Sequence, residues 1–301
     1  MYKELAIVAP TASGKTALSI ELAHKIDAVI LSLDSLAVYK QIDIASAKPT
    51  VDERDGIVHF GIDKVYPNEK FDVIEFIQEY KDAKEYAIQN GKNLIIVGGT
   101  GFYLKSMIEG LSPFPTLSKD TISIVKEKML KIEKVYEELS IKDNSYMKNI
   151  SSNDTYRVQK ALEIYTQTNQ TPSLYFEQNK PTPVISDINI FEIQTDTDKL
   201  RDRIKLRTKQ MIKSGIIDEV IFLEKEYTRK PNSMGSIGII ETLDYLDGKI
   251  NKEQLEEQIY IHTSQLAKRQ RTFNKSQFGH VYKENLENLE KKYYLWYNNW
   301  K

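Results

Sequence analysis

The stretch Ala9-Pro10-Thr11-Ala12-Ser13-Gly14-Lys15-Thr16 follows a short apolar run, residues 5–8, and precedes a helical pattern over residues 15–25. Glycine, lysine and threonine in this order between a strand and a helix are typical of a P-loop. In such a loop backbone N–H groups at the helix N-terminus bind phosphate oxygens, the lysine adds positive charge and the threonine can hold Mg²⁺. The sequence therefore predicts that residues 9–16 bind a nucleotide such as ATP, or another pyrophosphate, with Thr16 as the metal ligand.

The first position of this loop departs from the usual pattern. Ala9 stands where a P-loop has its first glycine, so we expect an opening turn that tolerates a Cβ atom. An alternative interpretation makes Ser13 or Thr11 a simple cap of the following helix. The position of Gly14-Lys15-Thr16 within a strand–loop–helix unit favours the phosphate site.

The residues around the loop predict an α/β fold. Apolar strands are expected at residues 28–31 and 93–97, and they alternate with helices over residues 15–25 and 69–90. This alternation is the pattern of a parallel sheet flanked by helices. Residues 188–193 are expected to add another strand, and the rest of the chain is mostly helical.

Two proline-rich stretches, residues 112–116 and 181–183, mark boundaries because proline cannot continue a helix. Between them apolar residues recur three or four positions apart, as in helices. We therefore expect a P-loop core built from residues 1–112 and 184–301, and an all-helical insertion over residues 113–183.

The composition of the chain excludes several classes of protein and of chemistry. The chain has 301 residues, 41% of them hydrophobic and 28% charged, as in a soluble globular protein. It has no cysteine, which excludes disulfides, thiol chemistry and Cys-ligated metals. No apolar run approaches the roughly 20 residues of a membrane-spanning helix, and the first residues lack a signal-peptide pattern. The expected compartment is the cytoplasm.

Charge is uneven along the chain although its net value is only −1. Residues 199–213 contain seven basic side chains and a single acid, Asp202, and residues 258–283 contain five basic side chains and no acid. Such segments can form a surface that attracts nucleic acid. The alternative is an ordinary solvated helix face.

Asp34 is the best-placed general base in the sequence. An ATPase or kinase would be expected to carry a carboxylate after a neighbouring strand, but residues 93–97 lead into Gly98-Gly99-Thr100-Gly101. Asp34 instead follows the strand at residues 28–31, and ligands gather at the carboxyl ends of parallel strands. Its alternative role is to stabilise the turn through its own side chain.

Taken in order, the motifs resemble the tRNA dimethylallyltransferases, also called tRNA isopentenyltransferases, of the bacterial type. The resemblance spans about residues 5–275. It rests on the P-loop, Asp34-Ser35, Ala47-Lys48-Pro49, residues 97–105, Asn153-Asp154, Arg157, residues 159–163, Arg203, Arg207, Asp218-Glu219-Val220 and Leu266-Ala267-Lys268-Arg269-Gln270.

The resemblance implies an activity. Members of this family transfer a dimethylallyl group from dimethylallyl pyrophosphate to N6 of the adenosine that follows the anticodon on its 3′ side. It implies that the P-loop and Arg207 bind the pyrophosphate with Mg²⁺ and without ATP turnover. It also implies that Asp34, Thr100 and Arg203 are catalytic.

It further implies a tRNA partner, bound through its anticodon stem-loop, and we expect a monomer that does not bind membranes. The expected tRNA-contacting residues are Asp34, Ser35, Leu36, Ala37, Thr100, Arg157, Gln159, Lys160, Ala161, Leu162, Glu163, Lys268 and Arg269. Several positions depart from the family pattern. Ala37 replaces a glutamine, Ser264 an arginine, Phe273 a tryptophan, and Ile239-Ile240 a Tyr-Lys pair.

Two other functions remain open at this stage. A small-molecule P-loop kinase would use the helical insertion as a lid, but Asp34-Ser35 and the Gly98–Gly101 block disfavour it. An RNA-binding protein without catalysis would explain the basic segments, but the intact Gly14-Lys15-Thr16 and Asp34 argue against it.

Overall fold

A parallel sheet places the sequence motifs at one edge. The computed structural model describes residues 2–286, 288, 289 and 291. Its six strands lie in the order β3-β2-β4-β1-β5-β6. They are β1 (Glu4–Val8), β2 (Ala28–Leu33), β3 (His59–Phe60), β4 (Asn93–Gly98), β5 (Asn189–Ile193) and β6 (Tyr282–Glu284). The predicted α/β class is confirmed, and β3 and β6 are too short to have been seen as apolar runs.

The strand register explains why distant motifs meet. Val8 and Leu33, the last residues of β1 and β2, are both paired with Gly98 at the end of β4. The residues that come next, Ala9 and Asp34, therefore leave the sheet at the same edge as Gly99. Parallel strands put their carboxyl ends together, which is where ligands bind in open α/β sheets.

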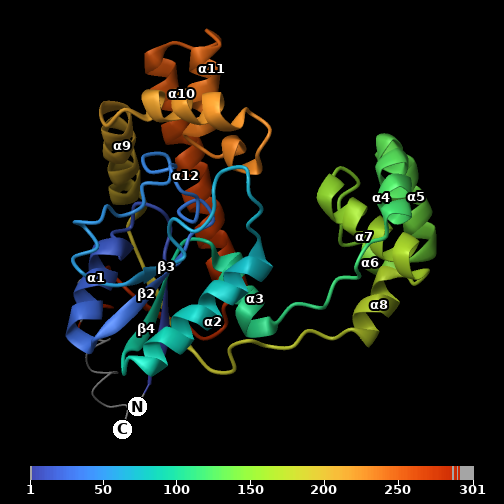
Figure 1. The fold of residues 1–301 in the computed structure, drawn as a ribbon, viewed down its shortest axis with the longest axis horizontal. Helices are drawn as coiled ribbons and strands as arrows, with labels where there is room; N and C mark the ends of the chain where they lie inside the picture. The colour runs from blue at the N-terminus through green and yellow to red at the C-terminus, as the bar shows by residue number, and fades with distance from the viewer. Residues whose placement is uncertain (1, 287, 290, 292–301) are drawn as a thin grey trace. The chain divides into compact units, whose positions relative to one another are not determined.

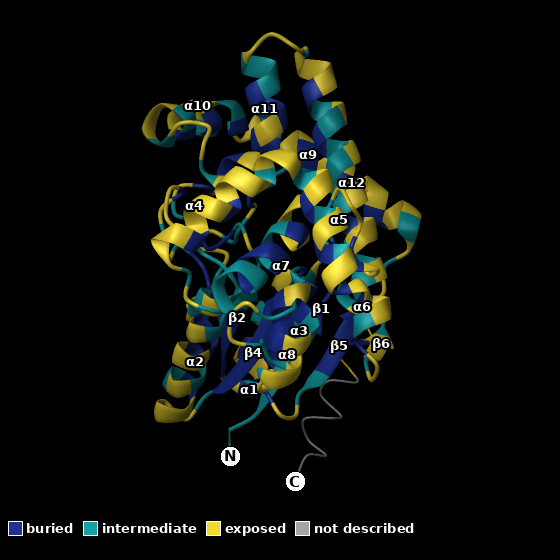
Figure 2. Cartoon of the chain, turned by 90° about the vertical axis from the view of Figure 1, so that its right-hand side faces the viewer, coloured by how far each residue is buried: buried dark blue, intermediate teal, exposed yellow. Residues whose placement is uncertain are grey.

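Helices α1 (Lys15–Ile26) and α2 (Val73–Gln89) cover the sheet (Figure 1). Leu18 and Leu22 of α1 pack with Leu5 and Ile7 of β1 in one core cluster. Burying such side chains stabilises the fold by about 1.5–3 kcal/mol each. This packing fixes α1 behind the P-loop, and Figure 2 shows the buried strands beneath helices with exposed outer faces.

Helix α2 begins later than the expected residue 69. The side chain of Asp72 accepts a hydrogen bond from Ile74 N, and that of Glu75 accepts one from Asp72 N. This reciprocal pair is a capping box, which satisfies two backbone donors at a helix start. It sets the first helical residue at Val73 and leaves residues 69–72 as a loop.

The remaining helices of the core carry one wall of the site. They are α3 (Gly101–Glu109), α9 (Thr197–Lys213), α10 (Ile216–Tyr227), η2 (Asn232–Gly235), α11 (Ile239–Leu246) and α12 (Lys252–Gln277). A second core cluster joins the loop after β2 to these helices, with Val38 and Ile42 packed near Met211 and Val220. Among the described residues no helix is both long and apolar enough to cross a bilayer.

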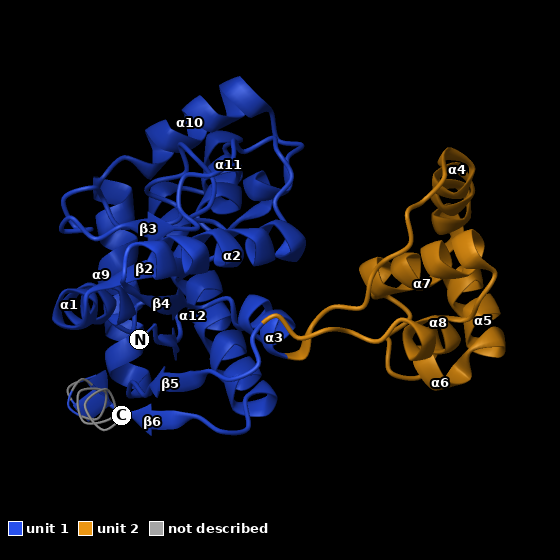
Figure 3. Ribbon diagram, turned by 60° about the horizontal axis from the view of Figure 1, so that its bottom comes forward, with its two compact units in different colours: residues 1–108, 185–301 blue, residues 109–184 orange. Residues whose placement is uncertain are grey.

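Residues 109–184 form a separate compact unit, shown in orange in Figure 3. Its helices are α4 (Lys119–Lys128), η1 (Met129–Lys131), α5 (Ile132–Lys142), α6 (Asn144–Met147), α7 (Thr155–Thr168) and α8 (Pro172–Gln178). The expected boundaries were 113 and 183. The unit begins earlier because Leu111 pairs with Thr182 in an antiparallel bridge, which attaches the first connector to the helical unit.

Candidate active site

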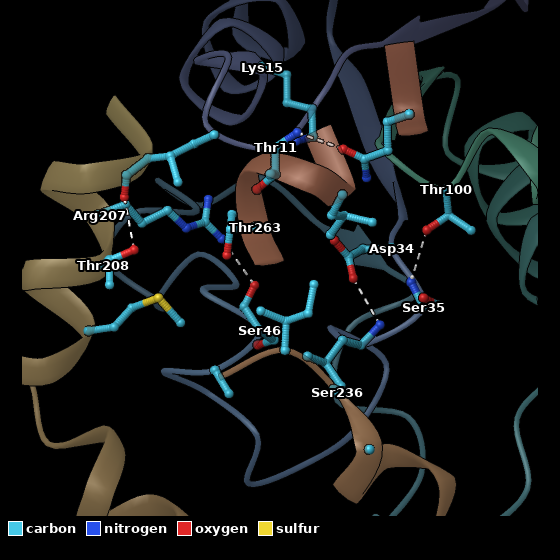
Figure 4. Close-up of a pocket in the computed structure, with 18 residues that line it drawn as sticks. Thr11, Lys15, Asp34, Ser35, Ser46, Thr100, Arg207, Thr208, Ser236 and Thr263 are labelled. Carbon is cyan, nitrogen blue, oxygen red and sulfur yellow. Dashed lines mark hydrogen bonds between the residues drawn. The ribbon is translucent and has the colours of Figure 1, made fainter. Parts of the chain in front are cut away.

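The edge of the sheet opens into a cavity of about 280 Å³ (Figure 4). Its walls come from the P-loop, the loop after β2, the loop after β4, α9, the residues before α11, and α12. The lining includes Lys15, Asp34, Thr100, Arg207, Ile237 and Gln270. Seven residues expected at the site from sequence therefore line one cavity: Thr11, Lys15, Asp34, Ser35, Leu36, Thr100 and Arg207.

The P-loop has the backbone features of an anion site. Gly14 is the N-cap of α1, with φ 91°, and no side chain caps this helix. The alternative in which Ser13 or Thr11 caps it is therefore wrong. Ser13 is fully buried, yet its Oγ has no hydrogen-bond partner. An uncapped helix N-terminus beside an unsatisfied hydroxyl is suited to phosphate oxygens.

The departure at Ala9 causes no backbone strain at that position. Ala12, with φ 62°, is among the non-glycine residues in the left-handed region, whereas Ala9 is not. The loop therefore turns at Ala12 and Gly14. Ala9 is buried against the sheet core, where its methyl group packs in the cluster that contains Leu18.

Lys15 and Arg207 bring two cations into the cavity. Burial and, to a lesser extent, the nearby Arg207 lower the pKa of Lys15 to about 8, while Asp34 acts in the opposite direction. Burial also lowers the pKa of Arg207, again against the influence of Asp34. A bound anion would stabilise the charged forms of both groups. The pair thus provides positive charge that is incompletely neutralised without a ligand.

Arg203 and Arg207 lie one turn apart on α9 but do different things. The Nη1 of Arg203 donates to the carbonyl oxygen of Ser13 at 3.0 Å, so Arg203 holds the P-loop. The Nη2 of Arg207 donates to Ser46 O at 3.4 Å and faces the cavity. Arg203 also lines an open groove beside Thr16, outside this cavity. The sequence spacing showed only that the two arginines share a helical face.

Asp34 combines its two possible roles. Its Oδ1 accepts hydrogen bonds from Leu36 N at 2.8 Å and Ala37 N at 3.2 Å, which is the turn-stabilising role. Both bonds use the same oxygen, and the carboxylate lines the cavity (Figure 4). The turn therefore orients Asp34 and is compatible with a function as general base.

Thr100 connects the two loops that follow β2 and β4. Its Oγ1 accepts a hydrogen bond from Ser35 N at 3.3 Å (Figure 4). Its hydroxyl thus lies beside the residue that follows Asp34. This contact fixes the separation of Thr100 and Asp34 across the cavity.

Helix α12 supplies a contact that sequence reasoning missed. The Oε1 of Gln270 accepts a hydrogen bond from Thr11 N at 2.9 Å, across 259 positions of sequence. A Cβ atom on Gly99 would lie 2.3 Å from Gln270 Nε2, so a larger residue there would displace the end of the Gln270 side chain from this position. The glycine pair at the end of β4, Gly98-Gly99, is the sequence signal of a close approach by another side chain. No residue near the pair in sequence identifies Gln270 as that side chain.

Glu219 of α10 holds the loop before Ser46. Its carboxylate accepts three backbone hydrogen bonds, from Asp43 N at 2.9 Å, Ile44 N at 2.7 Å and Ala45 N at 2.9 Å. Burial raises the pKa of Glu219, and these N–H groups act in the opposite direction. In the sequence Glu219 stands out only as part of the Asp218-Glu219-Val220 motif, and the structure gives it a positioning role.

Several side chains of the expected tRNA-contacting set are buried. Ala37 is buried beneath the site loop, and Ala161 and Leu162 pack in the core of the helical unit. Their side chains face protein, because α7 and the loop after β2 need apolar anchors. Glu163 is also buried.

The other expected contact residues remain accessible. Ser35, Arg157, Lys268 and Arg269 are exposed, and Leu36, Gln159 and Lys160 are partly exposed. In the helical unit, Glu163 binds Lys160 Nζ and Gln159 Nε2, each at 2.7 Å.

Comparison with known proteins identifies the family. A sequence model described as IPP transferase matches residues 37–277. This chain belongs to the IPP transferase family. A tRNA dimethylallyltransferase from Aliarcobacter butzleri is 57% identical over 287 residues, covering 95% of this chain and 96% of that protein. One from Sulfurovum sp. is 52% identical, covering 96% of each chain.

Solved structures of IPP transferases have a fold similar to that of this chain. A tRNA delta(2)-isopentenylpyrophosphate transferase from Staphylococcus epidermidis has 31% identity and a TM-score of 0.71, covering 99% of this chain and all of that one. A eukaryotic dimethylallyltransferase acting on tRNA has 28% identity and a TM-score of 0.82, covering 94% of this chain and 74% of that one. The predicted family is confirmed.

Proposed function

We propose that this IPP transferase transfers a dimethylallyl group from dimethylallyl pyrophosphate to N6 of the tRNA adenosine on the 3′ side of the anticodon. The product is N6-isopentenyladenosine. The observation that carries the proposal is that Asp34 shares one cavity with Lys15 and Arg207. This arrangement supports a base and a leaving-group site at a common reacting centre. We expect the protein to act as a cytoplasmic monomer.

The transfer requires stabilisation of a pyrophosphate leaving group. As the bond between the allylic carbon and the pyrophosphate oxygen breaks, the electron pair stays on that oxygen. The N–H groups of the P-loop, Lys15 and Arg207 would stabilise this developing charge. Arg203 would act indirectly, because its contact with Ser13 O keeps the loop in place.

The adenine amine must then lose a proton. Its lone pair is conjugated into the ring, so N6 is a weak nucleophile. Asp34 would hydrogen-bond the amine, orient it, and accept its proton as the bond from nitrogen to carbon forms. The hydroxyl of Thr100, held next to Ser35, would contact the nucleotide.

The residues present fit Mg²⁺ at this site. The side chain of Thr16 lies exposed beside the open groove at the start of α1. Magnesium sites use few protein oxygens and complete their coordination with phosphate oxygens and water. Thr16 would hold the ion, which supplies charge neutralisation for the pyrophosphate.

A direct assay tests the proposal. Purified protein is incubated with unmodified tRNA, dimethylallyl pyrophosphate and Mg²⁺. The tRNA is then digested, and the masses of the fragments are measured by mass spectrometry. We expect one C5 unit on the adenosine next to the anticodon. A parallel reaction replaces dimethylallyl pyrophosphate with labelled ATP. Phosphoryl transfer in that reaction, without a C5 product in the first, would favour the kinase alternative.

A further inference from the structure

The helical unit carries an exposed aromatic cluster, defined here as Tyr156 and Lys160 of α7 together with Phe114 from the segment before α4. Tyr156 is 71% exposed and Phe114 is 38% exposed. The Nζ of Lys160 lies 4.6 Å from the centroid of the Phe114 ring and 5.8 Å from that of Tyr156. All three residues belong to the helical unit.

The cluster is built on a fixed support. Val158 and Leu162 anchor α7 in the core of the unit. Buried Glu163 accepts hydrogen bonds from Lys160 and from Gln159, both at 2.7 Å. The hydrogen bond to Glu163 therefore fixes the ammonium group of Lys160 near both rings. A cation over an aromatic face is worth about 0.5–1 kcal/mol at an exposed site.

Packing within the unit does not account for Tyr156. Tyr146 stacks on Phe176 with ring centroids 5.7 Å apart, and Tyr136 donates hydrogen bonds to the carbonyl of Ile150 at 3.0 Å. Tyr156 instead leaves most of its ring in solvent. Large exposed rings beside cations are typical of surfaces that stack unpaired nucleobases.

Arg157, the residue after Tyr156, supplies exposed positive charge on the same turn of α7. Its side chain is 63% exposed. Its Nε lies 3.5 Å from Asp154, longer than a charge-assisted hydrogen bond of about 2.7–2.9 Å. The guanidinium can therefore turn toward a phosphate adjacent to a stacked base.

We propose that the aromatic cluster binds one unpaired nucleobase of the tRNA substrate by stacking on Tyr156, with Arg157 on the neighbouring phosphate. The identity of the RNA rests on the proposed function. The site would contribute to binding and to the opening of the loop, and it would leave the chemical step at Asp34 unchanged.

The test uses the full-length protein and an anticodon stem-loop RNA with 2-aminopurine at each loop position in turn. Wild type should change the fluorescence of at least one loop base, and Tyr156→Ala should abolish that change. Tyr156→Ala should weaken binding about tenfold, and Tyr156→Phe by less than about twofold because the ring remains. The KM for tRNA should rise while kcat is kept.

Two controls decide whether the effect is specific. Ile141→Ala removes another exposed apolar side chain of the unit, 87% exposed on α5, and should leave RNA binding unchanged. Phe114→Ala should weaken binding in the same direction as Tyr156→Ala. Equal RNA affinity and equal fluorescence for Tyr156→Ala and wild type would overturn the proposal, as would a lowered melting temperature with unchanged affinity.

Failure of this inference can be separated from failure of the proposed function. A wild-type protein that forms the C5 product with the same KM as Tyr156→Ala contradicts only the stacking site. A protein that shows the fluorescence change but forms no C5 product contradicts only the proposed activity. Absence of RNA binding by wild type contradicts both.

Discussion

Asp34 illustrates how one side chain can be held by the turn that it stabilises. Its Oδ1 accepts two backbone hydrogen bonds, from Leu36 and Ala37, while the carboxylate faces the cavity. An asparagine could keep the same acceptor bonds but could not take a proton from an amine. The structural and chemical roles of this residue can therefore be separated by mutation.

We predict that Asp34→Asn lowers kcat by at least about 10²-fold, the scale of a general-base contribution. Thermal stability and tRNA affinity should stay close to those of wild type because the turn is preserved. Asp34→Ala should lower kcat similarly and also lower the melting temperature. Single-turnover kinetics and calorimetry measure these effects. An unchanged kcat in Asp34→Asn would remove Asp34 from the chemistry.

Lys15 should make pyrophosphate binding depend on pH. Burial, aided by Arg207, lowers its pKa to about 8, so the ammonium is charged below that pH and neutral above it. We predict that affinity for inorganic pyrophosphate, measured by calorimetry without added metal, falls between pH 7 and pH 9 relative to Lys15→Arg. The arginine stays charged over this range. A constant ratio of the two affinities would contradict the prediction.

At the scale of elements, the site depends on helices that hold loops rather than on loops alone. Helix α10 holds residues 43–45 through Glu219, α12 holds Thr11 through Gln270, and α9 holds Ser13 through Arg203. Each contact satisfies a backbone group of a loop at the sheet edge. Unsatisfied buried groups are costly, so each contact stabilises one loop conformation.

We predict that Glu219→Gln weakens pyrophosphate binding several-fold and lowers the free energy of unfolding by about 1–3 kcal/mol. The amide places a donor against backbone N–H groups that need an acceptor. The loop should then release Ser46, the partner of Arg207. Glu226→Gln, an exposed change on the same helix, is the matched control. Equal pyrophosphate affinity in both variants would contradict the positioning role.

At the scale of the whole molecule, the net charge of −1 conceals two basic segments that pack together as α9 and α12. Leu200 and Ile204 of α9 are buried with Ala267 of α12, which leaves the basic side chains outside this contact. Lys268 and Arg269 are exposed on α12. The packing thereby concentrates positive charge in one region of the core unit.

We predict that replacing Lys268 and Arg269 with alanine weakens tRNA binding and flattens its dependence on salt. Loss of two phosphate contacts should reduce the slope of log affinity against log salt by up to about 2. Filter binding at several salt concentrations measures both quantities. Replacement of Lys225 and Lys252, two exposed lysines on α10 and α12, serves as the control. An identical slope in the two double variants would show that this surface does not meet RNA.

Much of the architecture was predictable because its signals are local. The P-loop, the position of Asp34 after β2 and the alternation of strands and helices follow from residue spacing within short segments. The start of α2 and the unit boundary at residue 109 were missed, because a capping box and a Leu111–Thr182 bridge decide them. Ala161 and Leu162 were expected to contact tRNA because they lie in a family motif. Their spacing is also the spacing of residues that pack on the inner face of a helix.

The class of fold and the positions of the P-loop and of Asp34 could be predicted from the sequence, because each follows from motif spacing and apolar periodicity within short segments. The tertiary structure alone decided that Arg203 holds the loop while Arg207 faces the cavity, and that Gln270 and Glu219 fix the site. Those contacts join residues 161 to 259 positions apart. Only packing of the helices against the sheet brings such partners within hydrogen-bond distance, and no local pattern encodes it.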